Sequence, residues 1–288
     1  MTENSYIIVT DSSCDMPAEV LREWGVPSVR LTFRFDGDEA DVADGDVPLT
    51  DFYARMRAGG VAKTSAASID AYTEAFRPLL EGGQDLLYIA FSSGLSSTRR
   101  NGEIASEDLV SVCPGQRVIV IDTLAASAGM GMLLYLAVRK RAEGASLDET
   151  AAYIEDTKLR LCHWFTVDDL VYLKRGGRIS AATAIVGGML QIKPVMHMDN
   201  EGHLVSVGKV RGRKASLQAL ADKYAQTCTD KSAPVFISHA DCPADADYLS
   251  SLIVAAGGPA PTAVYVGPVI GAHCGPGTVA LFFIGTER

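Results

Sequence analysis

The stretch DLLYIAFSSGLSST, residues Asp85–Thr98, decides the fold of this chain. Its first half, Asp85–Phe91, is a continuous apolar run of strand length, which is typical of a strand buried on both faces. Ser92, Ser93 and Gly94 follow directly, and a helix is expected after them. A buried strand that ends in a short polar loop and continues into a helix is the repeating unit of a parallel sheet.

The same order of strand, loop and helix recurs on both sides of this stretch. Upstream, Tyr6–Thr10 predicts a short strand, followed by polar residues and a helix that ends near Trp24. Downstream, Arg117–Ile121 predicts a buried strand ahead of a long helix from Ala125. Residues 31–60 interrupt the pattern as an irregular insert with a short hairpin. We therefore predict an N-terminal parallel-sheet α/β domain over residues 1–161.

The pattern changes after Leu161. Two short apolar segments, Val195–His197 and Leu204–Val210, flank the turn signal Asp199–Gly202, which predicts an antiparallel hairpin. Antiparallel strands separated by helices indicate an α+β two-layer domain over residues 162–288. Its other expected elements are strands over 163–167, 234–239, 262–266 and 279–284, and helices over 168–175, 179–190, 214–227 and 244–255.

Composition narrows the classes of protein. The chain has 288 residues, is 48% hydrophobic and 21% charged, and carries a net charge of −9. This composition excludes a disordered chain, and the acidic balance argues against a nucleic-acid binder, because phosphate contacts need clustered Lys and Arg. Six cysteines lack any metal-ligand spacing, and we see neither a signal peptide nor an uninterrupted membrane span. We expect a soluble cytoplasmic protein without a metal.

Hydroxyl side chains gather where the predicted strands end. In open parallel sheets, ligands bind beyond the carboxyl ends of the strands, and the helices that begin there favour an anion. The same residue types are also common helix caps, so either role fits any one of them. The four segments are Asp11–Ser13, Thr64–Ser65, Ser92–Ser93 and Asp122–Thr123.

Two other features leave their roles open. His273 lies in a glycine- and proline-rich segment, residues 267–277, which we expect to be a loop; its imidazole could donate to an oxyanion or be a plain loop residue. Basic residues are grouped in 174–178 and 209–214. They form either a solvated face or a patch for a phosphate or an acidic partner, and an interaction protein that uses Arg175 and Arg211 is a third possibility.

A hydrolase or phosphotransferase that uses Ser92 or Ser93 is the alternative from a different class. A nucleophilic serine needs a base and an oxyanion hole, and the chain has no GxSxG elbow. It also has no GxxxxGK[ST] phosphate loop. The sequence pairs neither serine with a His or an Asp.

Several segments together resemble the DegV family of bacterial fatty-acid-binding proteins. Each segment alone is weak, but their order matches and they span nearly the whole chain. Two departures stand out: Ala67 replaces the usual proline after the Thr-Ser pair, and Ser97 replaces a glycine. The matching segments are Val9–Asp15, Lys63–Ser65, Phe91–Ser96, Tyr172–Ile179, Gln191–Pro194, Lys209–Arg211 and Ile270–Gly277.

The resemblance implies a two-domain protein that holds one long-chain fatty acid between its domains. It implies that Thr64 and Ser93 hydrogen-bond the carboxylate, supported by His273, and that Arg178 and Arg211 lie near the pocket mouth. Ser65, Ser92 and Gly94 belong to the same ligand-binding segments. The resemblance further implies an acyl-binding subunit of bacterial fatty acid kinase. A separate ATP-dependent partner phosphorylates the bound acid to an acyl phosphate for phospholipid synthesis, and transient membrane contact fits that role. On this view the chain has no catalytic residue and no cofactor.

Overall fold

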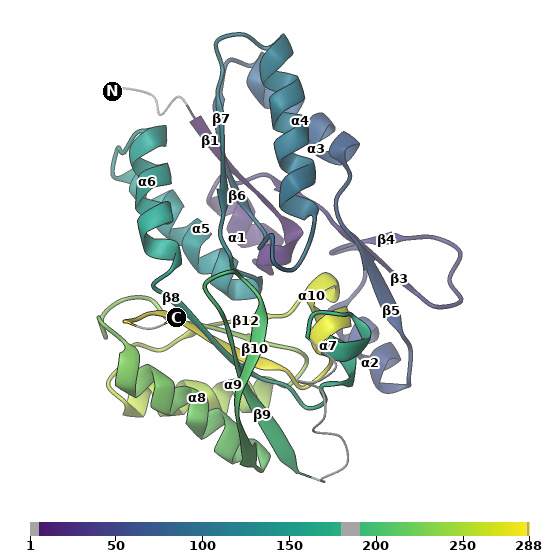
Figure 1. Ribbon diagram of the computed structural model, residues 1–288, viewed down its shortest axis with the longest axis vertical. Helices are drawn as coiled ribbons and strands as arrows, with labels where there is room; N and C mark the ends of the chain where they lie inside the picture. The colour runs from purple at the N-terminus through teal and green to yellow at the C-terminus, as the bar shows by residue number, and fades with distance from the viewer. Residues whose placement is uncertain (1–5, 180–190, 287) are drawn as a thin grey trace.

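The computed structural model describes residues 6–179, 191–286 and 288, so most of the predicted helix over Ile179–Leu190 lies outside the described residues. Figure 1 shows two sheet-containing regions, one above the other. The earlier part of the chain forms the upper region, and the later part forms the lower region. Among the described residues, no helix is long and apolar enough to cross a membrane.

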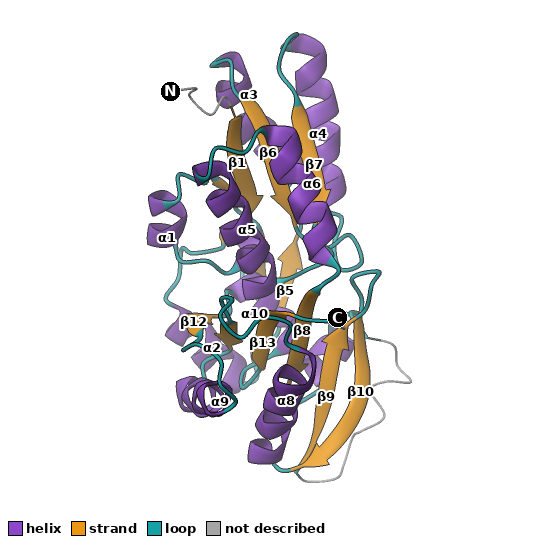
Figure 2. Ribbon diagram, turned by 90° about the vertical axis from the view of Figure 1, so that its left-hand side faces the viewer, coloured by secondary structure: helices purple, strands orange, loops and turns teal. Residues whose placement is uncertain are grey.

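The first region is built on a four-stranded parallel sheet with the order β2-β1-β6-β7. Alternate residues of the strand Asp85–Ala90 face opposite sides, so that Leu86 and Tyr88 pack with α3 and α4, while Leu87 and Ile89 pack with α5. Figure 2 shows the strands of this sheet between α4 on one side and α5 on the other. Both faces of the sheet are covered, as the continuous apolar run predicts. The strands are β1 (Tyr6–Asp11), β2 (Ser28–Val29), β6 (Asp85–Ala90) and β7 (Val118–Asp122). The helices are η1 (Ser12–Cys14), α1 (Ala18–Glu23), α3 (Ile69–Glu81), α4 (Thr98–Val112), α5 (Ser127–Ala142) and α6 (Leu147–Lys158).

The second region contains a six-stranded sheet with the order β10-β9-β8-β13-β11-β12, which is antiparallel except for the β11–β12 pair. Its two faces differ: Leu281 and Phe283 pack in the core under α8 and α9, whereas Phe282 faces the first region. The strands are β8 (Leu161–Thr166), β9 (Ile192–Met198), β10 (Leu204–Arg211), β11 (Phe236–His239), β12 (Thr262–Tyr265) and β13 (Val279–Ile284). The helices are α7 (Val171–Arg175), α8 (Arg213–Thr227), α9 (Pro243–Ala255) and α10 (Pro268–Cys274).

The insert over residues 31–60 contributes to a third, small sheet. Strand β3 (Thr32–Phe35) pairs antiparallel with β4 (Val42–Ala43) and with β5 (Ala62–Ser65), and the short helix α2 (Leu49–Arg57) lies between β4 and β5. Pairing of Phe33 with Thr64 fixes the position of the threonine. The predicted hairpin thus serves as the support for the Thr64–Ser65 segment.

The prediction of a loop over residues 267–277 is wrong for most of that segment, because Pro268–Cys274 forms helix α10. Pro268 occupies the first turn, where a proline fits because its missing N–H has no partner there. Gly275 ends the helix with a φ of 81°, which glycine adopts without strain. The residues that suggested a loop are therefore the boundaries of a short helix.

The predicted mixed α/β fold, with a parallel-sheet N-terminal region and a separate sheet-rich C-terminal region, is confirmed. The division into domains at Leu161 stays a prediction. Helix α5 contacts strands of both large sheets: β1 and β6 on one side, and β8, β11 and β13 on the other. This contact joins the two regions around one shared interior.

Candidate functional site

A cavity of about 310 Å³ lies between the parallel sheet and the six-stranded sheet. Both regions contribute to its wall, the second partly through helix α10, and most of the wall is apolar. A wall of this kind suits a ligand with a substantial hydrocarbon part. Representative apolar lining residues are Leu31, Phe91, Phe165, Met198, Ile270 and Phe282.

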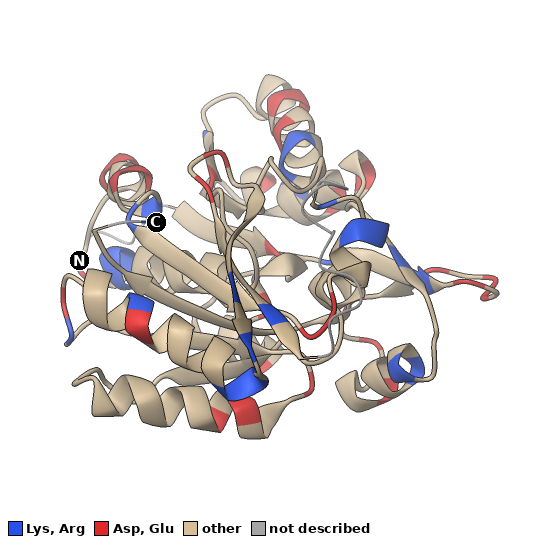
Figure 3. Ribbon diagram, turned by 60° about the horizontal axis from the view of Figure 1, so that its bottom comes forward, with Lys and Arg blue, Asp and Glu red and all other residues tan. Residues whose placement is uncertain are grey.

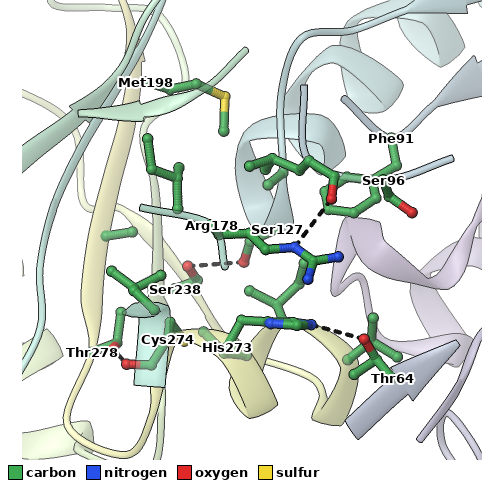
Figure 4. Close-up of a pocket in the computed structure, with 18 of the residues that line it drawn as sticks. Thr64, Phe91, Ser96, Ser127, Arg178, Met198, Ser238, His273, Cys274 and Thr278 are labelled. Atoms are coloured by element: carbon green, nitrogen blue, oxygen red, sulfur yellow. Dashed lines mark hydrogen bonds between the residues drawn. The ribbon is translucent and has the colours of Figure 1, made fainter. Parts of the chain in front are cut away.

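One polar group in the cavity wall joins Thr64 to His273. The Thr64 hydroxyl lies 2.8 Å from Nε2 of His273, and both residues line the cavity (Figure 4). The other ring nitrogen, Nδ1, is buried without a hydrogen-bond partner among the described residues. Gly176 packs so closely against this nitrogen that a Cβ at position 176 would overlap it. The imidazole is thus held in place by contact on one side and by Thr64 on the other.

Arg178 brings a positive charge into the same wall. Its Nε donates to the carbonyl of Leu95 over 3.2 Å, and a terminal nitrogen donates to the carbonyl of Gly176. No carboxylate pairs with its guanidinium among the described residues. Burial lowers the pKa of Arg178, but a guanidinium stays charged near neutral pH. A half-buried cation without a counter-ion is costly, so this position favours an anionic ligand.

His273 is neutral near pH 7. Burial, with the nearby charge of Arg178 as a second cause, lowers the pKa of His273 to about 4. A neutral imidazole donates from one nitrogen and accepts at the other. When Nε2 carries the hydrogen and donates it to Thr64, the hydroxyl hydrogen of Thr64 remains available for an anion. His273 thus positions Thr64, while Arg178 supplies the charge.

The lowered pKa of His273 predicts a specific acid dependence of stability. The unfolded chain protonates this histidine near pH 6.5 and the folded chain only near pH 4, so the folded state loses stability as the pH falls through that interval. We expect the ligand-free protein to lose roughly 3 kcal/mol more than a His273→Gln variant between these two pH values. Urea unfolding at several pH values measures this difference. Equal pH dependence in the two proteins would contradict the assignment.

The serine-rich loop after β6 is placed differently from what its sequence suggests. Ser92 is fully buried; its hydroxyl donates to the carbonyl of Gly202 over 3.0 Å and accepts from the N–H of Gly94. Ser93 is exposed, and its N–H donates to Asp122 over 3.2 Å. The residues of this loop that line the cavity are Phe91, Leu95, Ser96 and Ser97. Direct contact of Ser92 or Ser93 with a ligand stays a prediction.

Sequence reasoning missed Ser96. The residue lies in the quoted loop, two positions after Gly94, and its side chain lies on the same side of the cavity as Arg178 and Thr64 in Figure 4. The only indication in the sequence was the pair of serines, Ser96 and Ser97, that follows Leu95. It does not reveal which serine faces inward, because the loop path decides that.

Gly94 sets this path through a close backbone contact with the β9–β10 turn. A Cβ at position 94 would lie 2.8 Å from the carbonyl oxygens of Glu201 and Gly202. We expect Gly94→Ala to lower the free energy of unfolding by about 1–3 kcal/mol, as overpacking does elsewhere. Gly208→Ala is the matched control, since the one described atom near its Cβ would be Cβ of Val195, at 3.9 Å. Urea unfolding of both variants tests this; equal stability would rule out the contact.

The remaining predicted site residues lie at the edge of the cavity or outside its lining. Ser65 is exposed but still contributes to the lining beside Thr64. Arg211 is exposed at the end of β10 and is not a lining residue. Figure 3 colours the ribbon blue at Lys and Arg and red at Asp and Glu, and both colours occur on several elements of the chain. A ligand role for Ser65 or Arg211 stays a prediction.

Fold and site together define a class: a two-region α/β protein with an apolar interior cavity and an anion-favouring group in its wall, suited to an amphiphilic ligand. The chain belongs to the DegV family. The family model described as "Uncharacterised protein, DegV family" matches residues 5–286. A DegV domain-containing protein of Clostridium perfringens is 36% identical over 286 residues, which cover 98% of each chain.

Solved structures agree with this assignment. A fatty-acid-binding DegV family protein from Thermus thermophilus has 30% identity and a TM-score of 0.88, covering 98% of this chain and 99% of its own. A stearic acid-binding protein from Eubacterium ventriosum has 26% identity and a TM-score of 0.86, covering 97% and 98%. The prediction of DegV membership is thereby confirmed.

Proposed function

We propose that this protein binds one long-chain fatty acid in the cavity, with the carboxylate at Arg178, Thr64 and His273 and the acyl chain along the apolar wall. The observation that carries the proposal is the guanidinium of Arg178, which lies in a mostly apolar wall and lacks an anionic partner among the described residues. The fatty acids bound by solved relatives support the same ligand class.

The energetics suit a carrier. Burial of each methylene of the chain contributes about 0.8 kcal/mol, so a long acyl chain supplies most of the affinity. A buried carboxylate is costly unless it is hydrogen-bonded and neutralised. The Thr64 hydroxyl, positioned by His273, offers a hydrogen bond, and Arg178 offers the charge. None of these groups needs to act as a nucleophile or a base in this role.

Titration of the delipidated protein tests the binding step. We expect palmitic acid to bind at a single site with much higher affinity than octanoic acid, because the shorter chain buries fewer methylenes. Isothermal titration calorimetry at a fixed pH measures both constants. Equal affinities for the two acids would place the ligand outside the cavity.

We further propose that the protein presents the carboxylate to a separate ATP-dependent kinase in the cytoplasm and has no catalytic activity of its own. Ser93 and Arg211 are exposed and lie outside the cavity lining, so their side chains can contact such a partner or a passing membrane surface. The hydrolase alternative gains no support, because the Ser92 hydroxyl bonds to two backbone groups, the carbonyl of Gly202 and the N–H of Gly94.

A kinase-coupled assay tests the second step. Protein loaded with labelled fatty acid is incubated with ATP and a host-cell extract, and acyl phosphate is trapped with hydroxylamine as the hydroxamate. We expect hydroxamate only when the loaded protein, the extract and ATP are all present. Hydroxamate from protein and ATP alone would show an intrinsic activity and contradict the carrier role.

A further inference from the structure

The cavity wall holds a second polar group, formed by Ser127 and Ser238. Their hydroxyl oxygens lie 3.0 Å apart, both residues line the cavity, and their exposed fractions are only 5% and 1%. Figure 4 shows the two hydroxyls facing each other, and the Thr64–His273 contact is a separate pair. This second group is not used in the proposed binding of the carboxylate.

The position of Ser238 is unusual for its strand. Alternate residues of β11 face opposite sides of the sheet, and Phe236 shares the cavity-side face with Ser238. The neighbouring strand β13 presents Ala280 opposite Ser238, with Phe282 two residues further on. A hydroxyl therefore replaces an apolar side chain in the middle of an apolar surface. Such a buried hydroxyl is unfavourable unless its hydrogen-bonding positions are filled.

Ser127 is held in place at a conformational cost. It begins α5 with a φ of 53°, in the left-handed region that serine rarely adopts. Its hydroxyl donates to Oδ2 of Asp15 over 2.5 Å, and Oδ1 of Asp15 accepts the N–H of Gly267 over 2.9 Å. Asp15 also has a positive φ, of 54°. Two residues with strained backbone, Asp15 and Ser127, thus form a series of hydrogen bonds that ends at Ser238.

The series of hydrogen bonds from Asp15 through Ser127 leaves Ser238 with one unused hydrogen-bonding position. When Ser127 uses its single hydrogen toward Asp15, Ser238 must donate to Ser127, and its own lone pairs remain open. When Asp15 is protonated, Asp15 donates to Ser127 and Ser127 donates to Ser238, so the hydroxyl hydrogen of Ser238 has no acceptor. Among the described residues, Ser127 is the only side-chain partner of the Ser238 hydroxyl in either case. Because Ser238 lines the cavity, a ligand group can fill this position.

The chemistry of the ligand group follows from its neighbours. Arg178 attracts the carboxylate elsewhere in the cavity, so the ligand group beside Ser238 belongs to the uncharged part of the ligand. A hydroxyl group both donates and accepts a hydrogen bond, so it can pair with Ser238 in either of the two arrangements. We propose that this cavity selects fatty acids that carry a hydroxyl group along the acyl chain, with Ser238 as the residue that determines this specificity. The inference rests on the proposed binding of a fatty acid.

Competition binding tests the proposal. Delipidated protein is loaded with labelled stearic acid, which is displaced by a series of monohydroxystearic acids whose hydroxyl is moved stepwise along the chain. We expect one position of the hydroxyl to bind about fivefold more tightly than stearic acid, the gain of one hydrogen bond. Ser238→Ala is expected to abolish this preference while it still binds stearic acid.

Ser106→Ala is the matched control, since Ser106 is also buried but bonds to the carbonyl of Gly102 in α4, outside the cavity lining. It should retain the preference. The proposal is overturned if no isomer exceeds stearic acid in the wild type, or if Ser238→Ala keeps the preference. The wild-type series alone decides the matter if Ser238→Ala fails to fold. Failure of stearic acid itself to bind would instead overturn the proposed function.

Discussion

Arg178→Gln lowers the affinity for a long-chain fatty acid by about 10- to 100-fold, the range expected for one hydrogen bond to a charged group. Glutamine keeps a polar, hydrogen-bonding side chain, shorter than that of arginine, but removes the positive charge that attracts the carboxylate in the mostly apolar wall. Calorimetric titration of delipidated protein with palmitic acid measures the change. We expect the affinity of the variant for a neutral analogue, the fatty alcohol, to change much less.

Arg175→Gln is the control for this substitution. Arg175 precedes Arg178 by three residues but is exposed, and its guanidinium lies over the ring of Tyr172. It does not line the cavity. We expect this variant to bind palmitic acid like the wild type. If both arginine variants bind equally, the carboxylate does not lie at Arg178.

Ala280→Phe has an expected effect at the upper end of that range, and it acts on the acyl chain rather than on the carboxylate. Ala280 lines the cavity from β13. It pairs with Phe165 of β8 on one side and with Ser238 of β11 on the other. A phenyl ring there fills space that the chain needs. Exclusion of about four methylenes removes roughly 3 kcal/mol, which corresponds to a loss of affinity of about a hundredfold.

The size of this loss depends on the protein staying folded. Ala255→Phe introduces the same side chain at an exposed position at the end of α9 and serves as the control. Thermal unfolding of both variants shows whether the fold persists. We expect Ala280→Phe to keep its affinity for octanoic acid better than for palmitic acid. An unchanged affinity for palmitic acid would place the acyl chain elsewhere.

The sequence allowed the fold to be predicted where the signal is local. The apolar run ahead of Ser92 predicts a strand buried on both faces, and the structure has it at the centre of the parallel sheet. The same local logic failed for Pro268–Cys274, where proline and glycine indicated a loop but mark the ends of a helix. A single proline fits both situations, and only the packing of α10 against α7 and β5 distinguishes them.

The site was harder to predict, because it depends on contacts between distant segments. Thr64 meets His273 across 209 positions of sequence, and no pattern near either residue encodes that contact. The family resemblance brought both residues together. It did not identify Ser96, since the loop orientation depends on Gly94 against the turn at Gly202. The contact between Ser127 and Ser238 was equally hidden in the sequence, because neither residue belongs to a recognisable motif.

The amount of fatty acid that remains on the protein after gentle purification tests the central claim most directly. Denaturing extraction followed by mass spectrometry, applied to the wild type and to Ala280→Phe prepared in parallel, measures it. The account predicts close to one long-chain fatty acid per wild-type chain and a strongly reduced amount in the variant. Wild-type protein without fatty acid, or a folded variant that retains as much as the wild type, would contradict it.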